Sequence, residues 1–158
     1  MISERKRQKL KIEHKPTRAK YSVEETKKFL SDHQRGRAPE TRQMILPGWT
    51  DLLVRFIRRL EEHDPSMFVT RVRSKHGGMT VYVDHGDAEV YRMIFELEYV
   101  SRFTCEECGR KGRFTPLGHV GTAQTLCARD FRRQLKKYGV RVPFGFSVFR
   151  NGSAKSSI

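Results

Sequence analysis

Apolar residues recur every three or four positions along several stretches of the chain, and the clearest of these covers residues 50–63. This spacing gives a helix one apolar face, because residues three and four apart lie on the same side of it. The apolar positions are Leu52, Leu53, Phe56, Ile57 and Leu60. Thr50 is predicted to cap this helix, and Asp64-Pro65 to end it. Trp49, in the preceding turn, is expected to anchor the core rather than to stack on a nucleic-acid base.

An earlier helix is predicted to begin at Ser22, because Ser22 and Glu25 have the spacing of a capping box. Gly36 and Pro39 are expected to end it. Its apolar face is thin and consists of Val23, Phe29 and Leu30. The sequence therefore leaves open whether this helix packs on the protein's own core or on a partner.

Two strands are predicted in the middle of the chain, at residues 67–74 and 79–84, because both stretches are rich in β-branched residues. His76-Gly77-Gly78 between them suits a hairpin turn. Asp87 is predicted to cap a third helix that continues to about Ser101. The inward positions of this helix are Val90, Met93, Ile94, Leu97 and Val100.

The last predicted helix runs from Cys127 to Tyr138 and ends at Gly139. A short hairpin that includes Phe114 and Leu117 is expected before it. Together with the C-x2-C pair of Cys105 and Cys108 and the later Cys127, these elements predict an α+β fold, with a small helix and β-hairpin core, a treble-clef-like zinc unit and basic terminal extensions. The predicted division is an N-terminal basic arm with one helix at residues 1–46, a zinc-stapled core at 47–138, and a basic tail at 139–158.

All three cysteines of the chain lie close together, with Cys105 and Cys108 in a C-x2-C pair and Cys127 after eighteen further residues. A thiolate pair on a tight turn, followed by a thiolate at the start of a helix, is typical of one tetrahedral zinc ion. We therefore expect a single structural Zn²⁺. An odd number of cysteines at metal-binding spacing also favours a reducing, cytoplasmic environment over a disulfide-bonded one.

Zinc requires a fourth ligand, for which the sequence offers two candidates. Asp130 follows Cys127 by three residues, one helical turn further on, where a treble-clef-like site has its last ligand. His119, in the loop between the ligand pairs, is the alternative. Asp130 is preferred, although an acid in the first turn of a helix is also explained by the helix dipole.

The net charge of +14 is unevenly distributed along the 158 residues. Residues 1–20 carry eight lysines and arginines against two acids, and residues 21–46 carry five against four. Residues 47–131 are balanced at twelve against twelve, whereas residues 132–158 carry seven against none. A neutral core with basic ends favours attachment to a polyanion over a purely solubilising role for the ends.

The predicted function is therefore that of a non-enzymatic zinc-binding accessory protein that attaches to nucleic acid or a ribonucleoprotein through phosphate contacts. The predicted contact residues are Arg5, Lys6, Arg7, Lys9, Lys11, Arg132, Arg133, Lys136 and Lys137. In an alternative hypothesis the neutral core binds a host protein and acts as an inhibitor or adaptor. That alternative predicts an apolar patch near Phe144, Phe146 and Phe149. Neither hypothesis involves a membrane, because no apolar run approaches the length of a bilayer span.

Catalysis is a third, less favoured hypothesis. Val83-Asp84-His85 resembles the start of an HNH nuclease motif, but the motif also needs an Asn and a second His on a later helix. The single Asn is Asn151, near the end of the chain, and the single later histidine is His119. Phosphate-binding glycine loops are also missing from the sequence, so we expect no enzymatic activity.

Four short segments resemble a family of small proteins of unknown function encoded by bacteria and bacteriophages. They are Gly48-Trp49, residues 73–83, the stretch from Ser101 to Gly109, and Thr125-Leu126-Cys127. The family pattern is GW, K-F-G-x-L-R-x-Y, S-x-x-C-x-x-C-G and T-L-C-x-x-H or C. The resemblance implies a zinc-stapled α+β domain and a phage or prophage setting, hence a bacterial host cytoplasm. Asp130 stands where the family has His or Cys.

Overall fold

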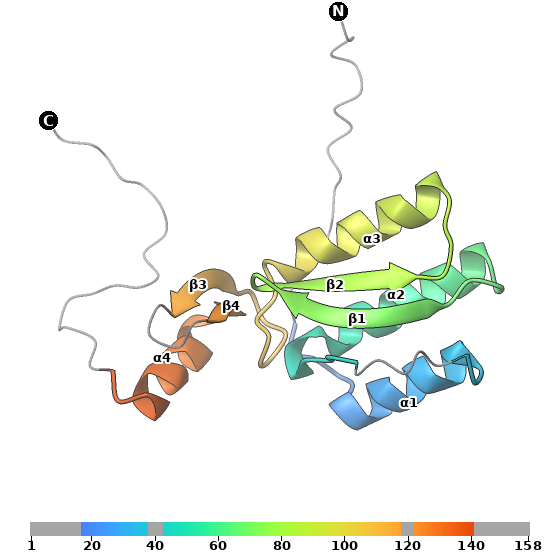
Figure 1. The fold of residues 1–158 in the computed structure, drawn as a ribbon. Coiled ribbons are helices and arrows are strands. Elements are labelled where there is room, and N and C mark those ends of the chain that lie inside the picture. The colour runs from blue at the N-terminus through green and yellow to red at the C-terminus, as the bar shows by residue number, and fades with distance from the viewer. Residues whose placement is uncertain (1–16, 38–42, 118–121, 141–158) are drawn as a thin grey trace, which may run out of the picture.

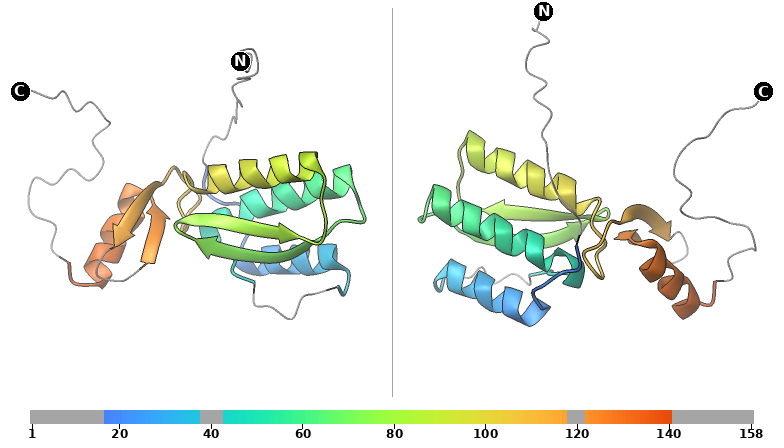
Figure 2. Two further views of the ribbon diagram at one scale, coloured as in Figure 1. Left: turned by 45° about the horizontal axis from the view of Figure 1, so that its top comes forward. Right: turned by 180° about the vertical axis from the view of Figure 1, so that it is seen from behind.

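A β-hairpin packed on a layer of three helices forms the larger part of the molecule (Figure 1). The computed structural model describes residues 17–37, 43–117 and 122–140. The hairpin pairs β1 with β2, and α2 lies between α1 and α3 in the helix layer, as the view from behind shows (Figure 2). The bounds are α1 (Val23–Gln34), α2 (Thr50–His63), β1 (Val69–Lys75), β2 (Gly78–Val83) and α3 (Ala88–Ser101). We call this part, residues 17–37 and 43–102, the helical unit.

A second, smaller group of elements lies at one end of the helical unit (Figure 1). It consists of the loop with the first two cysteines, the hairpin of β3 (Arg113–Leu117) and β4 (Thr122–Leu126), and α4 (Ala128–Lys137). We call residues 103–117 and 122–140 the cysteine unit. Mixed helices and small antiparallel sheets confirm the predicted α+β class. Among the described helices, none has the length and apolar character that a membrane crossing requires.

The helical unit has one continuous apolar core to which all three helices and both strands contribute. α1 joins it through Leu30, which is fully buried, and through Phe29, which packs against it. The open question about this helix is thus answered, since α1 packs on the protein's own core. The buried core residues are Leu30, Trp49, Leu52, Leu53, Phe56, Ile57, Leu60, Met67, Val69, Val72, Met79, Val81, Val90, Met93, Leu97 and Val100.

The caps of α1 and α3 form as predicted. Ser22 and Glu25 make a reciprocal capping box, and the Asp87 side chain accepts hydrogen bonds from the first amides of α3. The predicted cap of α2 is wrong by one residue. The 3-10 turn η2 (Pro47–Trp49) leads straight into the helix, so Thr50 is its first residue. Trp49 holds the cap position, and its side chain makes no capping hydrogen bond. The Thr50 hydroxyl instead donates to the carbonyl of Tyr21 at 2.9 Å.

The predicted hairpin of β1 and β2 is confirmed, with an irregularity that the alternation of residues did not reveal. His76 and Gly77 form its turn with positive φ angles of 50° and 72°. The register shifts between Val69 and Arg71, so one extra residue is inserted at that point. As a consequence Val69 and Val72, which an unbroken strand would direct to opposite faces, both lie in the core.

The two units meet at a close backbone contact between the start of α2 and the turn that holds the first cysteine pair. The Gly48 amide donates to the Glu106 carbonyl at 2.7 Å, and Trp49 Nε1 donates to the Thr104 carbonyl at 3.0 Å. A Cβ atom on Gly48 would lie only 1.8 Å from the Cys105 carbonyl oxygen. Only glycine can therefore occupy position 48 with the two backbones this close. The indole of Trp49 is buried in the core, as predicted.

Replacing Gly48 by alanine should destabilise the protein by more than about 2 kcal/mol, because the backbone of one unit must move away from the other. Urea unfolding followed by the fluorescence of Trp49 measures the change. Gly36→Ala is the matched control, since Gly36 has a φ of 75° and open space around its Cβ position. That control should lose only about 1 kcal/mol, from backbone strain. Equal losses in the two variants would show that the contact at Gly48 is loose.

Candidate metal centre

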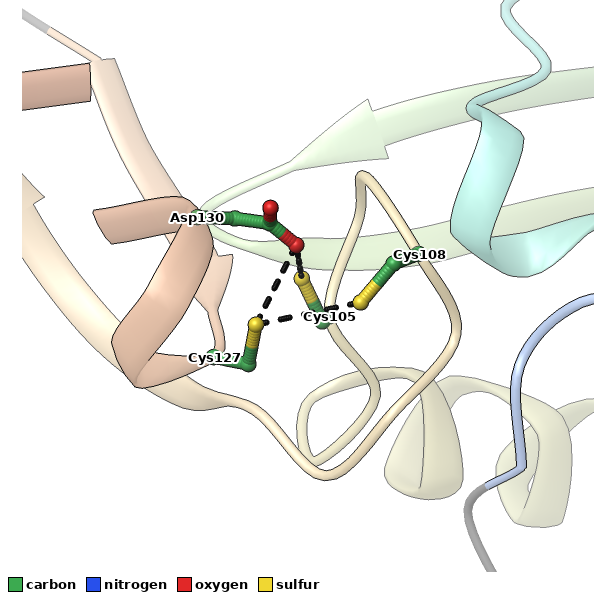
Figure 3. A group of neighbouring side chains, drawn as sticks. All are labelled: Cys105, Cys108, Cys127 and Asp130. Carbon is green, nitrogen blue, oxygen red and sulfur yellow. Dashed lines mark hydrogen bonds between the residues drawn. The ribbon is translucent and has the colours of Figure 1, made fainter. Parts of the chain in front are cut away.

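The side chains of Cys105, Cys108, Cys127 and Asp130 converge on one point of the cysteine unit (Figure 3). Their nearest sulfur and oxygen atoms all lie within 4.8 Å of one another. Three thiols and a carboxylate at this separation can hold a metal ion. The four residues come from two places, a turn before β3 and the first turn of α4, which the hairpin of β3 and β4 brings together.

The turn that carries the first pair is shaped by its own backbone. The Gly109 amide donates to the Cys105 carbonyl at 3.0 Å, and the Cys105 amide donates to the Arg110 carbonyl at 2.7 Å. Gly109 has a φ of 79°, a left-handed conformation that glycine adopts without strain. The Cys108 carbonyl accepts a bond from the Ala19 amide at 3.1 Å, so the segment before α1 also braces the turn.

The second pair is placed by the N-terminus of α4. Cys127 is the N-cap residue, and Asp130 is the third residue of the helix, on the same side. Phe131 and Leu135, one turn apart, pack against Leu126 in the small apolar cluster of this unit. This packing fixes the rotation of the helix and thereby directs Asp130 toward the thiols.

Asp130 is only 1% exposed, and both of its oxygens have donors nearby. Oδ2 accepts from the thiols of Cys105 at 3.4 Å and Cys127 at 3.1 Å, and from Arg129 Nη2 at 3.5 Å. Oδ1 faces Arg129 Nε at 3.3 Å and Arg133 Nη1 at 3.4 Å. Burial alone would raise the pKa of the Asp130 carboxyl. Hydrogen bonds from Cys108, Cys127 and Arg129 outweigh burial and hold that pKa well below its usual range. The site therefore contains a fixed negative charge.

The thiols of Cys105 and Cys108 favour their protonated form in the absence of a cation. Burial raises the pKa of the Cys105 and Cys108 thiols, and the neighbouring Asp130 raises that of Cys108 further. Cys108 Sγ and Cys127 Sγ lie 3.8 Å apart, too far for a disulfide. A metal ion entering this site would displace the thiol protons, since thiolate is the form that binds metals.

Glu106, between the first two cysteines, has a structural role that sequence reasoning missed. It is 4% exposed, and its carboxylate accepts a bond from the Thr125 amide at 2.8 Å. The Glu106 amide in turn donates to the Thr125 carbonyl at 2.9 Å. Burial raises the pKa of Glu106 to about 7. The hydrogen bond from the Thr125 amide opposes this rise, and the nearby charge of Glu107 adds to it. The spacing of charged residues gives no signal for such a contact, because Glu106 and Glu107 look alike in the sequence.

The other predicted site residues fall into three groups. On α4, Arg132, Arg133, Lys136 and Lys137 are exposed. The other five predicted phosphate contacts (Arg5, Lys6, Arg7, Lys9 and Lys11) lie outside the described residues, as do His119, Phe144, Phe146, Phe149 and Asn151. Asp84 and His85 bond to each other at 2.7 Å in the loop before α3. The whole length of α3, about 20 Å, separates that loop from the cysteine unit.

The chain matches no known protein family, curated protein or solved structure. The resemblance to small phage proteins accordingly stays a prediction. What is known of the site rests on its own geometry.

Replacing Glu106 by alanine should lower the free energy of unfolding by about 1 to 3 kcal/mol, because the Thr125 amide would be buried without an acceptor. Glu106→Gln keeps an acceptor oxygen and should lose less. Glu107→Ala removes an exposed acid from the neighbouring position and serves as the control. Chemical unfolding of the metal-loaded protein ranks the three variants. Equal effects of Glu106→Ala and Glu107→Ala would contradict a structural role for Glu106.

Proposed function

We propose that Cys105, Cys108, Cys127 and Asp130 bind one structural zinc ion. Ligands at ordinary zinc distances in a tetrahedron lie about 3.8 Å apart for two sulfurs and about 3.5 Å apart for a sulfur and an oxygen. The corresponding separations here are 3.8 Å between the Cys108 and Cys127 sulfurs, and 3.4 and 3.1 Å from Asp130 Oδ2 to Cys105 and Cys127. Three soft thiolates with one carboxylate favour zinc over magnesium or calcium, which take oxygen ligands.

The order of elements supports a treble-clef-like arrangement. Two ligands come from a tight turn, a β-hairpin follows, and two ligands come from the first turn of a helix. In such a unit the metal connects parts that have little apolar surface of their own. Side chains of the protein would fill all four coordination positions, which is typical of a structural site rather than a catalytic one.

We further infer that the zinc-stabilised cysteine unit presents a cationic surface to the phosphates of nucleic acid. The observation that carries this proposal is the separation of charge between the two units. Over residues 17–37 and 43–102, fourteen basic residues are opposed by twelve acidic ones. In the cysteine unit eight basic residues, all exposed, are opposed by a single exposed acid, Glu107, since Glu106 and Asp130 are buried. The eight are Arg110, Lys111, Arg113, Arg129, Arg132, Arg133, Lys136 and Lys137.

Four of the eight lie within the balanced stretch of residues 47–131, and the other four lie in the basic stretch that follows it. The arms add to this basic surface, because residues 1–16 carry six basic residues against two acids and residues 141–158 carry three against none. Contacts of this kind are made to phosphates and give affinity with little sequence specificity. The function we propose is therefore that of a non-enzymatic binding protein, in the phage setting that the sequence resemblance implies.

Zinc binding is tested by measuring the metal content of the purified protein and the absorption of its cobalt-substituted form. We expect one zinc per chain and the thiolate-to-cobalt and tetrahedral bands of a sulfur-rich site. Asp130→Ala should weaken metal binding by more than about tenfold, whereas Asp130→Cys should retain it with a stronger thiolate band.

The alternative fourth ligand has its own control. His119→Ala should leave the metal content and the cobalt spectrum unchanged. A loss of metal in His119→Ala, together with retention in Asp130→Ala, would identify His119 as the ligand. A protein that purifies without metal and gives no cobalt thiolate band would contradict the zinc proposal itself.

Nucleic-acid binding is tested with a variant that removes three charges from α4, Arg132→Ala, Lys136→Ala and Lys137→Ala. Arg133 is retained because it contacts Asp130. Fluorescence anisotropy with duplex DNA and structured RNA over a salt series should show weaker binding. The salt slope on duplex DNA should fall by about 2 to 3, since each lost phosphate contact removes about 0.9.

A matched control removes the same charge from the helical unit, through the exposed residues Lys28, Arg55 and Lys75. This variant should keep most of the wild-type slope. Equal losses in both variants would mean that only the net charge matters and would contradict a surface on α4. If the wild type binds neither nucleic acid, the hypothesis of a host-protein adaptor takes its place.

A further inference from the structure

Four aromatic side chains form an exposed stripe along α3. Tyr91, Phe95, Tyr99 and Phe103 are between 47% and 62% exposed, although large aromatic residues are usually buried. They follow one another at intervals of four residues, so they lie on one side of the helix and of the turn that continues it. We call these four residues the aromatic stripe.

The stripe is separate from the face by which α3 joins the core. That inner face is made by Val90, Met93, Leu97 and Val100. A surface helix needs only one such face, and its remaining positions are normally polar. Sequence reasoning identified the inner face and overlooked the second, although the spacing of the aromatic residues was visible in the sequence.

Three of the four rings, those of Phe95, Tyr99 and Phe103, contact one another in a continuous row. Phe95 and Tyr99 are stacked, with ring centroids 6.4 Å apart, and Tyr99 and Phe103 are tilted at 5.1 Å. A contiguous exposed apolar patch of this kind marks an interaction surface more often than an isolated aromatic residue does. α4, which carries most of the cationic residues, does not lie beside α3 (Figures 1 and 2).

On the side of α2, the cations beside the stripe are already paired and offer a phosphate little to bind. Arg92 is bonded there to both Glu89 and Glu96. Arg59 of α2 is likewise bonded to Glu96. These guanidinium groups already have carboxylate partners, so none of the three pairs leaves a free cation for a phosphate.

The size and the symmetry of the stripe fit a second copy of the chain. Four half-exposed aromatic side chains offer roughly 400 to 500 Å². Two copies would bury about twice that from the rings alone, close to the lower limit for a specific interface. The equal spacing makes the stripe self-complementary. With two α3 helices antiparallel about a two-fold axis at Leu97, Phe95 faces the partner's Tyr99 and Tyr91 faces the partner's Phe103.

We propose that the aromatic stripe is the interface of a homodimer in which two α3 helices pack antiparallel. Each tyrosine then meets a phenylalanine, and the tyrosine hydroxyls lie at the edge of the interface where water can reach them. This inference does not depend on the metal or on nucleic-acid binding.

Sedimentation equilibrium of the full-length, metal-loaded protein over a concentration series tests the proposal. The wild type should associate reversibly into dimers, and the double variant Phe95→Glu with Tyr99→Glu should associate at least about 100-fold more weakly. Tyr82→Glu is the matched control, because Tyr82 is 45% exposed on β2, outside the stripe. It should associate like the wild type. Trp49 fluorescence confirms that each variant is folded.

A pair of single variants tests the proposed register. Phe95→Lys and Tyr99→Glu should each self-associate weakly, but their mixture should form a heterodimer in which the lysine faces the glutamate. A wild type that is monomeric throughout, or a Tyr82→Glu variant as impaired as the double variant, would overturn the proposal. So would single-stranded RNA binding that is lost in the double variant of a monomeric protein, since the stripe would then be a surface for bases.

Discussion

A carboxylate with almost no exposure to water must be balanced by cations or hydrogen-bond donors, and Asp130 has both. The thiols lie against one oxygen, Arg133 lies against the other, and Arg129 reaches both. The cysteine unit depends on this arrangement because its own apolar cluster is small, with Leu126, Phe131 and Leu135 as its only large buried side chains in the described residues. A zinc ion held by four ligands would supply the connection that this cluster lacks.

The turn that carries Cys105 and Cys108 is also hydrogen-bonded to the helical unit through its backbone. The carbonyls of Thr104 and Glu106 accept from Trp49 and Gly48, at the start of α2. At the other side of the junction the Thr125 hydroxyl donates to the Gly77 carbonyl, in the turn of the first hairpin, at 2.6 Å. The cysteine unit thus contacts two separate parts of the helical unit, the start of α2 and the turn of the first hairpin.

Features set by local spacing could be predicted from the sequence, and features set by distant contacts could not. The helices, both hairpins and the convergence of Cys105, Cys108 and Cys127 follow from periodicity, turn residues and ligand spacing. The burial of Glu106 and the role of Gly48 depend on segments that meet only in the folded chain. Residues 103–131 look balanced in the sequence, with four bases against three acids, because a sum along the chain does not distinguish buried acids, such as Asp130, from exposed ones.

Thiolates that hold a metal are also the side chains that oxidants attack first. Cys127 caps α4, and Asp130 lies in its first turn. Two of the four proposed metal ligands thus lie at the start of the helix that carries the exposed arginines and lysines. Oxidation of the cysteines would expel a bound metal and remove the support at the start of α4. The cationic surface would then lose its fixed orientation while the helical unit, whose core contains no cysteine among its buried residues, stays folded. The cysteine unit would in this way respond to the redox state of its surroundings.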